Sequence, residues 1–549
     1  MRSWIMPLAL LATFGCSEPS NYYRDVQPIL DANCVSCHRA AGAGPFALTT
    51  YEEAKRVGRQ LVQVTQSGYM PPWRAAEGKH ELLGARHLSS DERGRLKRWF
   101  EEGMPAGNGL DAAPRELPSL ETSWARGEPD LLLTLDQPFE LPADGEDLIR
   151  NFVLPGSTRR DRWVRAVELR PGNPKVVHHA ILKVDATGYS RRLAELDPSP
   201  GFGGMEMGNA ESPDGELVIW APGTQPLPPD REVAWPLTAA ADWVLQLHLV
   251  PSGKREQIEP QVAVYFTEQP PKERPLGMLL KNEQLDIPAG ESNYTVEDSL
   301  TLPVDARLMA LFPHAHYLGS AMTIWADLPN GERDELLSIP KWDFDWQEFY
   351  RFEQPVSLPA GSTLRFRYRY DNSDNNVRNP NRPAQRVVGG NRSVDEMATL
   401  GVQIVAETPQ GRERLQRAQF ERLIEKGDRS AAVHYNLGVV FARQGQLEQA
   451  ASHYQQALQL DPDDHFAHFG LGSVLARQRR FGDAERHYRR AVELQPEFAD
   501  AQYFLGRVYL DLNRAEAARR QFERTLEIEP THPRAQRALG ELRARKSSP

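Results

Sequence analysis

The 549-residue chain has little cysteine, which limits how it can be stabilised. Its three cysteines are Cys16, Cys34 and Cys37, and the last two stand only three positions apart. Small exported domains often depend on several disulfides, and this chain cannot build such a framework. Its domains must therefore be held together by buried apolar cores.

The chain also lacks an excess of positive charge. Its 75 aspartates and glutamates outnumber its 65 lysines and arginines, which gives a formal net charge of −10. Binding to a phosphate backbone requires a basic stripe or patch, and the sequence shows none. We therefore expect no nucleic-acid partner.

The amino-terminal apolar run, Trp4 to Phe14, is too short to span a bilayer as a mature helix. It follows Arg2 and precedes a small residue and Cys16, which is the layout of a secretory signal over residues 1–16. The segment is either an ordinary cleaved signal or, because Thr13 to Cys16 resembles an imperfect lipobox, a lipoprotein signal with a lipid anchor on Cys16. Both alternatives predict export, to the periplasm or, as a lipoprotein, to the outer membrane.

The length predicts several domains, since roughly 150 residues is typical of one. Residues 21–106 contain three runs with helical periodicity, namely Tyr22–Asn33, Tyr51–Gln66 and Ser89–Glu102, and so predict a small all-α domain. Residues 107–129 are rich in proline, glycine and alanine and are expected to be a linker.

From 130 to 406 the pattern changes to short alternating runs broken by Pro, Gly, Asn and Asp, which is typical of β-strands. The clearest runs are Leu131–Leu135, Val176–Val184, Trp243–Val250, Arg307–Phe312, Thr363–Tyr370 and Ala398–Val405. So many short strands in one region favour two all-β sandwiches over one. A proline-rich interruption divides them into 130–272 and 273–406.

The last region is an internal repeat with a period of 34 residues. The residues that recur at this spacing are Gly438, Gly472 and Gly506, Ala450, Ala484 and Ala518, and Pro462, Pro496 and Pro530. This period is that of the tetratricopeptide repeat (TPR), an α-solenoid whose concave face contacts other proteins. We expect a linker helix over 409–430, three repeats over 431–532, a capping helix over 533–545 and a protein partner.

A haem-attachment motif lies in the predicted helical domain, in Cys34-Val35-Ser36-Cys37-His38. Two cysteines on one helical turn can form thioethers to a single porphyrin, and the adjacent His38 can bind the iron. A zinc site would need a second pair of ligands, and a dithiol redox site does not need the histidine. The motif therefore predicts one covalent haem c.

The sixth iron ligand is open at this stage. Met70 is followed by two prolines, which favour an extended loop that can present the thioether sulfur. Met104 is the rival, with His80 and His87 as weaker candidates. Residues 22–106 resemble the small cytochrome c domains in front of bacterial copper oxygenases, where a Met-Pro-Pro-Trp loop recurs. That resemblance favours Met70.

Five histidines gather in three of the strand-like runs. His314 and His316 are two residues apart, so on a strand they point to one face and can bind one metal. The adjacent His178 and His179 would point to opposite faces of a regular strand. A metal that they share therefore requires a strand end or a β-bulge.

Two further residues stand out by their position on a strand. A lone histidine such as His248 is usually a satisfied core residue, but His248 shares its face with Gln246 and is expected to face a polar space. Met397 falls on the same side as Thr399 and Gln403, away from the apolar face of its strand. A thioether beside two imidazoles suits Cu(I) and leaves a position open for O2.

The order of these motifs is similar to that in the copper type II, ascorbate-dependent monooxygenases, the family of peptidylglycine α-hydroxylating monooxygenase and dopamine β-hydroxylase. The resemblance covers about 130–406 and rests on His178-His179, Leu245-Gln246-Leu247-His248, His314-Ala315-His316 and Asp395-Glu396-Met397. It implies two coppers per chain, one in each jelly-roll-like sandwich. The electron-transfer copper would be held by His178, His179 and His248, and the catalytic, oxygen-activating copper by His314, His316 and Met397.

The chain departs from the family at positions that bear on the substrate. Phe312 stands where the peptide-hydroxylating member has an arginine for a carboxylate, and Thr399 and Gly401 stand where Asn and Tyr are usual. A C-terminal glycine peptide is therefore not the expected substrate. The disulfides typical of the family cannot form here.

The resemblance implies an enzyme that hydroxylates an unactivated C–H bond of a small substrate with O2. Its electrons would come from an ascorbate-like donor or a redox protein, or through the fused haem c. The alternative is a non-catalytic, exported haem and copper electron-transfer module that docks through its repeats. The incomplete His314/His316/Met397 ligand set favours the enzyme, since pure electron transfer needs no open position.

Overall fold

The computed structural model describes residues 19–547 with gaps at Ala40, Ala41, Ala43, 110–123, 155–157, Arg159, Thr187, Glu206, Asn209, Glu211, 214–217, 222–223, 225–233, Ala240, 271–273, Glu283 and Asn391. The predicted signal over 1–16, with Cys16, and most of the predicted linker lie outside the described residues. Contacts divide the chain into two units: residues 1–77, 81–274 and 339–353, and residues 78–80, 275–338 and 354–549. No helix in the described part is long and apolar enough to cross a membrane.

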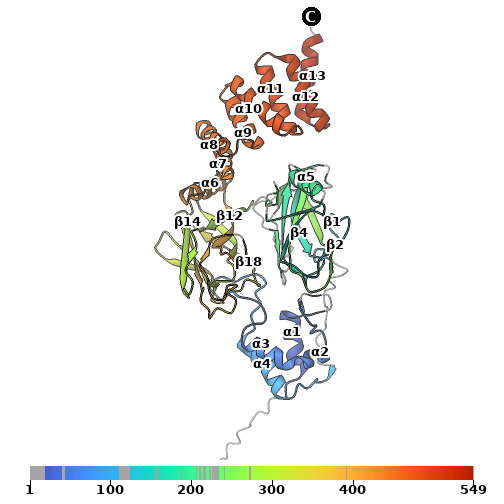
Figure 1. The fold of residues 1–549 in the computed structure, drawn as a ribbon, viewed down its shortest axis with the longest axis vertical. Coiled ribbons are helices and arrows are strands. Elements are labelled where there is room, and N and C mark those ends of the chain that lie inside the picture. The colour runs from blue at the N-terminus through green and yellow to red at the C-terminus, as the bar shows by residue number, and fades with distance from the viewer. Residues whose placement is uncertain are drawn as a thin grey trace, which may run out of the picture. The chain divides into compact units, whose positions relative to one another are not determined.

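The first unit begins with the predicted helices (blue in Figure 1). Their bounds are η1 Tyr22–Val26, α1 Gln27–Asn33, α2 Tyr51–Arg56, α3 Gly58–Gln66 and α4 Ser90–Glu101. The predicted helix over 51–66 is two helices, because Val57 leaves the helical region with φ −110° and ψ 11°. α4 begins as expected after Ser89, whose side chain exchanges hydrogen bonds with Glu92 in a capping box.

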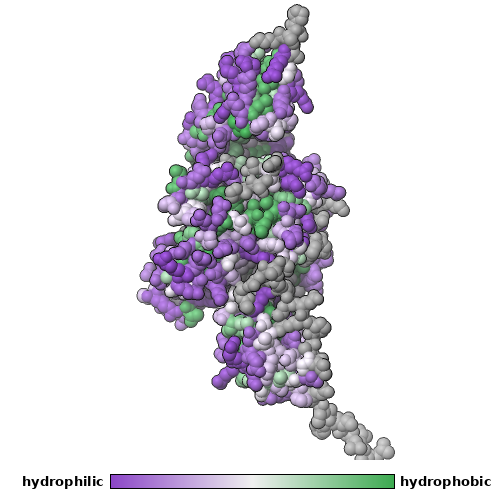
Figure 2. All heavy atoms as spheres, turned by 90° about the vertical axis from the view of Figure 1, so that its right-hand side faces the viewer, coloured by the Kyte–Doolittle hydropathy of each residue, from purple (hydrophilic) through white to green (hydrophobic). Residues whose placement is uncertain are grey.

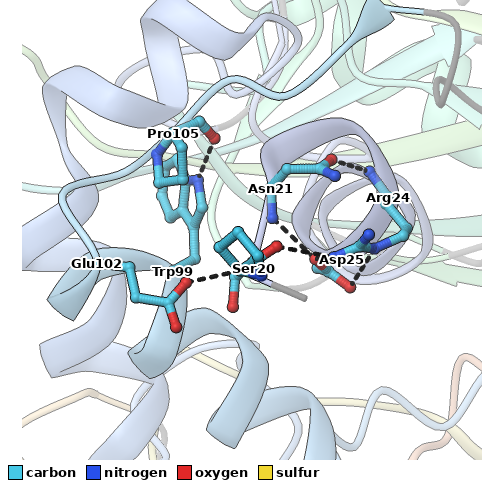
Figure 3. A network of polar contacts seen from close by, with 8 residues as sticks. Ser20, Asn21, Arg24, Asp25, Trp99, Glu102 and Pro105 are labelled. Atoms are coloured by element: carbon cyan, nitrogen blue, oxygen red, sulfur yellow. Dashed lines mark hydrogen bonds and ion pairs between the residues drawn. The ribbon is translucent and has the colours of Figure 1, made fainter. Parts of the chain in front are cut away.

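Polar contacts tie the start of this helical domain to the end of α4 (Figure 3). The backbone N–H of Ser20 donates to the Glu102 carboxylate at 2.7 Å, and the Trp99 indole N–H donates to the Pro105 carbonyl at 3.0 Å. Trp99 is fully buried and belongs to the apolar core that the helices share. The domain thus has a core of its own, with its first and last segments fastened together.

The rest of the first unit is mainly antiparallel sheet. Its elements are β1 Leu131–Thr134, β2 Phe139–Leu141, β3 Leu148–Leu154, β4 Arg162–Arg170, β5 Val177–Asp185, α5 Tyr189–Leu196, β6 Phe202–Gly203, β7 Val218–Trp220, β8 Trp235–Leu237, β9 Asp242–Leu249, β10 Glu256–Ile258 and β11 Gln261–Thr267. The larger sheets have the orders β1-β11-β4-β8 and β6-β3-β9-β5-β7, and β10 pairs with β2. One apolar core joins both larger sheets, so they form a sandwich.

The second unit carries the remaining sheets. Its strands are β12 Leu276–Lys281, β13 Asp286–Ile287, β14 Tyr294–Thr301, β15 Ala306–His314, β16 Gly319–Asp327, β17 Arg333–Ile339, β18 Tyr350–Leu358, β19 Thr363–Tyr370, β20 Val387–Val388 and β21 Thr399–Ala406. The end of β17 and the start of β18, at 339 and 350–353, fall in the first unit. They form sheets of order β12-β21-β15-β18 and β14-β19-β16-β17, with β13 paired to β20. All six strand-like runs expected from the sequence are strands, which confirms the all-β interpretation of this region.

The carboxy-terminal helices confirm the predicted repeat. α7 Ala431–Arg443 and α8 Leu447–Leu460, α9 His465–Arg477 and α10 Phe481–Leu494, and α11 Ala499–Asp511 and α12 Ala515–Ile528 are the three helix pairs, and α13 Pro533–Ser547 follows as the cap. Gly438 recurs at 34-residue intervals because a Cβ there would lie 2.7 Å from the Tyr454 ring. Hydrophilic side chains cover much of the array in Figure 2, between narrower apolar areas.

The helix before the array is α6 Pro409–Glu425, and it packs on the β-strands of its own unit. Its Arg422 forms an ion pair with Asp298 of β14, and both side chains are more than nine-tenths buried. Arg422 also donates to the Ser299 carbonyl at 2.6 Å. α6 is therefore part of the β region's packing as well as a connector to the repeats.

Two truncations are expected to differ for this reason. Deleting residues 431–549 should leave the β region as stable as in the full chain, because each repeat packs on its neighbours. Deleting 409–549 also removes Arg422 and leaves the buried Asp298 charge without this partner, a loss of about 3–5 kcal/mol. Thermal denaturation followed by near-ultraviolet circular dichroism checks this, and equal midpoints for the two truncations would contradict it.

Candidate metal and haem sites

Three histidines of the first unit converge on one point, which we call the trihistidine cluster: His178, His179 and His248. Each offers a ring nitrogen, and these nitrogens lie within 4.8 Å of one another. His179 of β5 stands opposite His248 of β9, and the register shifts between Val177 and His179. His178 is the extra residue of that bulge, which confirms the irregularity that adjacent histidines need if they are to share a metal.

Hydrogen bonds and burial prepare the trihistidine cluster for an ion. The Nε2 atom of His248 lies 3.0 Å from an Asp147 carboxylate oxygen, which leaves its Nδ1 atom for a metal. Burial, helped by the neighbouring His248, lowers the pKa of His178 to about 4, so that ring is neutral at neutral pH. Three imidazoles are a donor set that fits copper.

β9 has the polar side that the sequence predicted, but side chains and hydrogen bonds fill the space beside it. Gln246 is almost fully buried, and its amide donates to the Asn151 side chain at 2.9 Å and to the Met205 carbonyl at 3.0 Å. These bonds fix the strand beside His248. The space expected around the histidine is thus a packed polar layer with the cluster at its end.

The second predicted set, His314, His316 and Met397, lies where β15 and β21 meet. His314, the last residue of β15, pairs with Thr399, the first residue of β21, so His316 and Met397 each lie two residues beyond that pair. The two imidazole centroids are 5.1 Å apart. The Nδ1 atom of His316 lies 2.9 Å from the Asp395 carbonyl, which leaves Nε2 for an ion.

The strand that follows Met397, β21, is more buried than its sequence pattern suggests. Gln403, expected on the non-core side, is 1% exposed, because residues 400–405 of β21 are all buried and both faces of the strand are therefore covered. Met397 itself, just before the strand, is half-buried. The methionine is thus distinguished by its place at the strand's end and not by an exposed face.

Glu396 is a site residue that sequence reasoning missed. Its carboxylate accepts the backbone N–H groups of His316 at 2.8 Å, Leu318 at 2.7 Å and Met397 at 3.0 Å. It is 1% exposed, and burial raises its pKa to about 7. A carboxylate directly before an apolar strand was the available signal. Glu396 holds the backbones of two predicted ligands in place.

Replacing Glu396 by alanine is expected to weaken copper binding at His314, His316 and Met397 by roughly 10–100-fold, as losses of outer-shell partners do. The variant also leaves three buried N–H donors without their acceptor. Copper titration of the reduced protein measures the effect. Glu297→Gln is the control, since Glu297 is half-exposed and pairs with Arg367, which is not one of the predicted ligands. Equal copper affinity in Glu396→Ala and Glu297→Gln would refute the role.

The Cys34–His38 segment follows α1 as a helical turn. The backbone N–H groups of Cys37 and His38 donate to the Cys34 carbonyl at 3.1 and 2.9 Å. The Nδ1 atom of His38 lies 3.0 Å from the Phe46 carbonyl, leaving Nε2 for an iron. Burial raises the pKa of Cys34 to about 12, which does not suit a reactive dithiol. These residues fit a covalent haem.

Contacts of the candidate sixth ligands differ. Met104 packs on the helical core, and a Cβ on Gly58 would lie only 2.4 Å from its sulfur. His80 bonds to the Asp334 carboxylate at 3.0 Å. The His87 ring lies 6.0 Å from that of Trp73. Met104 and His80 thus have contacts of their own, while Met70 is half-buried and stays the predicted sixth ligand.

The loop after Met70 contacts residues 342–350, which we call the bridging segment. Arg74 donates to Asp343 at 2.7 Å, and Arg86 forms an ion pair with Glu348. The Trp73 ring lies 5.4 Å from that of Tyr350. Trp73, three residues after Met70, thus packs against the bridging segment.

The bridging segment also contacts the trihistidine cluster. The ring of its Phe344 lies 5.6 Å from the His178 ring, and an Asp345 carboxylate oxygen lies 4.0 Å from His178 Nε2. Phe344 and Asp343 are both more than nine-tenths buried. Within the first unit, one short segment therefore links the loop that follows Met70 with the cluster.

Comparisons with known proteins bear on the carboxy-terminal region. Family models described as "Tetratricopeptide repeat" match residues 431–464, 469–533 and 506–548. This region is a tetratricopeptide-repeat array. No curated protein matches the chain.

Solved structures that are similar to part of the chain include the following three. MamA is 23% identical over 25% of this chain and 80% of its own, with a TM-score of 0.24. YrrB, a TPR protein with an unusual peptide-binding site, is 27% identical over 23% and 65%, with a TM-score of 0.22. The first TPR of Spaghetti (RPAP3), bound to an HSP90 peptide, is 26% identical over 22% and 97%, with a TM-score of 0.22.

Proposed function

We propose that residues 130–406 form a copper-dependent monooxygenase that hydroxylates an unactivated C–H bond of a small substrate with O2. The observation that carries this proposal is the trihistidine cluster. Two β-strands, a bulge and the Asp147 carboxylate bring three imidazoles within ligand distance of one another. Such an arrangement of converging, partly buried histidines fits a transition-metal ion better than a packed core.

The residues divide the work between two coppers. His178, His179 and His248 would hold one, and His314, His316 and Met397 the other. Bound copper supplies one-electron redox chemistry and activates O2. The chain supplies orientation: Asp147 and the Asp395 carbonyl each bond one imidazole nitrogen, and Glu396 fixes the backbone of His316 and Met397. Two imidazoles and a thioether leave a position open for the oxidant.

The fused haem domain supports a supply of electrons. Cys34, Cys37, His38 and Met70 would hold one haem c, which provides a one-electron carrier. The bridging segment contacts both the Met70 loop and His178, as an electron route between them requires. Tethering also raises the effective concentration of the carrier at the copper region. An ascorbate-like donor or a redox protein would reduce the haem or the copper.

The remaining parts suit an exported, docked enzyme. We propose export through the segment 1–16, with lipid on Cys16 as the anchoring alternative. The TPR array suggests a protein partner, since solenoids of this kind present an extended concave surface for binding. Neither part bears on the chemistry itself.

A non-catalytic electron-transfer module would use the same ligands, so turnover must decide between the two. Copper-loaded protein with ascorbate and ¹⁸O2 is incubated with a panel of small molecules that carry unactivated C–H groups. Incorporation of one ¹⁸O atom per product, dependent on copper, supports the monooxygenase. Reversible copper and haem reduction, with no product and no reductant-dependent O2 uptake, favours the module.

A further inference from the structure

Two pairs of histidines in the TPR array lie outside the proposed oxygenase. His434 of α7 faces His453 of α8, and His468 of α9 faces His487 of α10. The second pair stands 34 residues after the first, so both occupy the same two positions of successive repeats. Each pair therefore lies between the two helices of its own repeat.

The nitrogens of each pair are spaced as ligands of one ion are. The two Nδ1 atoms are 3.3 Å apart in the first pair and 3.0 Å apart in the second. Two imidazole nitrogens at the usual bond length of about 2.0 Å from one ion are about 2.8 Å apart in square-planar and about 3.3 Å apart in tetrahedral coordination. Both pairs lie within that interval.

Neighbouring groups hold these rings in a ligand-ready form. The Nε2 atom of His468 lies 3.0 Å from the Pro462 carbonyl, which only accepts, so Nε2 carries the hydrogen and Nδ1 keeps its lone pair. The His453 ring stacks on Phe441 with centroids 5.2 Å apart. Burial lowers the pKa of all four histidines, to about 4 for His487. All four side chains are half-buried, so solvent reaches the pairs.

We propose that each histidine pair binds one divalent first-row transition-metal ion, with Cu²⁺ bound most tightly. Imidazole nitrogen is a preferred donor for these ions, and Cu²⁺ heads the divalent affinity series. In the second pair the hydrogen on His487 moves from Nδ1 to Nε2 when the ion binds, so no net proton is released. Two protein ligands leave the other positions to water. The sites do not depend on the proposed oxygenase, and either proposal can fail alone.

The third repeat provides a matched control within the chain. Gln502 and Gln521 stand where the earlier repeats have histidines. Gln502 donates its side-chain amide to the Pro496 carbonyl at 3.2 Å, which reproduces the bond of His468 to Pro462. Substituting glutamine at the histidine positions should thus preserve the helix packing while removing the ligand nitrogens.

The experiment counts Cu²⁺ bound by the full-length chain in equilibrium dialysis. Relative to the unmodified protein, H434Q/H453Q and H468Q/H487Q should each bind one ion fewer, and the fourfold variant two fewer. The electron paramagnetic resonance signal that the unmodified protein shows and the variants lack should display nitrogen hyperfine coupling. Far-ultraviolet circular dichroism verifies the helices of each variant. Equal copper counts in the unmodified and fourfold proteins would overturn the proposal.

A second measurement needs no variant, so it remains valid if a substituted chain fails to fold. Carbethoxylation of the unmodified chain is mapped by mass spectrometry with and without Cu²⁺. Protection of all four array histidines by Cu²⁺ supports the proposal. Unchanged modification at these four, alongside protection at His178, His179 and His248, shows that copper binds only in the β region and overturns it.

Discussion

Alanine at position 397 is expected to abolish O2-dependent turnover while copper remains at the trihistidine cluster. Glu396 accepts the backbone N–H groups of both His316 and Met397, which lie just beyond the paired ends of β15 and β21. Without the thioether, two imidazoles are left to stabilise the reduced ion. Loss of a direct ligand should exceed the roughly 10–100-fold cost in affinity or activity that outer-shell losses bring. Product formation and X-ray absorption of the reduced protein measure the two effects.

Met397→Leu separates ligation from packing, because leucine keeps much of the volume and lacks the sulfur. We expect it to fold as the parent does and to lose both turnover and the sulfur signal at copper. If Met397→Ala or Met397→Leu turned over as fast as the parent, Met397 would not be a copper ligand. Loss of copper from both clusters would point to a general folding defect instead.

Replacing Cys34 and Cys37 by serine is expected to remove the covalent haem and all turnover driven by a protein reductant. Turnover driven by ascorbate should be largely retained, because the small donor reaches copper from solution. The helical domain retains its apolar core in this variant, apart from the change at Cys34 itself. Haem absorbance and turnover with each reductant are compared. Equal loss with both reductants would indicate a structural role for the haem domain, and no loss with either would contradict the electron supply.

A second variant locates that supply in the bridging segment without touching a haem ligand. Asp343→Asn removes the charge that Arg74 binds at 2.7 Å in a site where both side chains are largely buried. Haem should remain attached, while its oxidation by the copper-loaded protein, followed by stopped-flow absorbance, slows.

 The control is Lys341→Gln, which changes an exposed charge just before the segment. Equal rates of haem oxidation in Asp343→Asn and Lys341→Gln would contradict this route.

The sequence predicted the regular elements and the bulge at the adjacent histidines well, because both depend on local patterns. Six strand runs and the 34-residue repeat are confirmed, and the adjacent His178 and His179 already required the bulge found between Val177 and His179. Side chains alternate along a strand, so two adjacent histidines can share a metal only at a bulge or a strand end. Metal and haem binding themselves stay predictions.

What the sequence did not predict depends on contacts between distant residues. The buried carboxylate of Glu396 matters only because the chain brings Leu318 and His316 back to it. The bridging segment contacts the Met70 loop although some 270 residues separate Arg74 from Asp343. Likewise, only the packing of α6 shows that Arg422 completes the core around Asp298. No periodicity or short motif encodes such pairs.

Copper and haem analysis of the full-length chain tests the central claim most directly. It is best done on the fourfold glutamine variant of the array, so that only the β region is counted. The account predicts two coppers and one covalent haem per chain, with one copper lost in His248→Ala and the other in Met397→Ala. A chain that binds no copper, or whose copper count is unchanged by both substitutions, would contradict it.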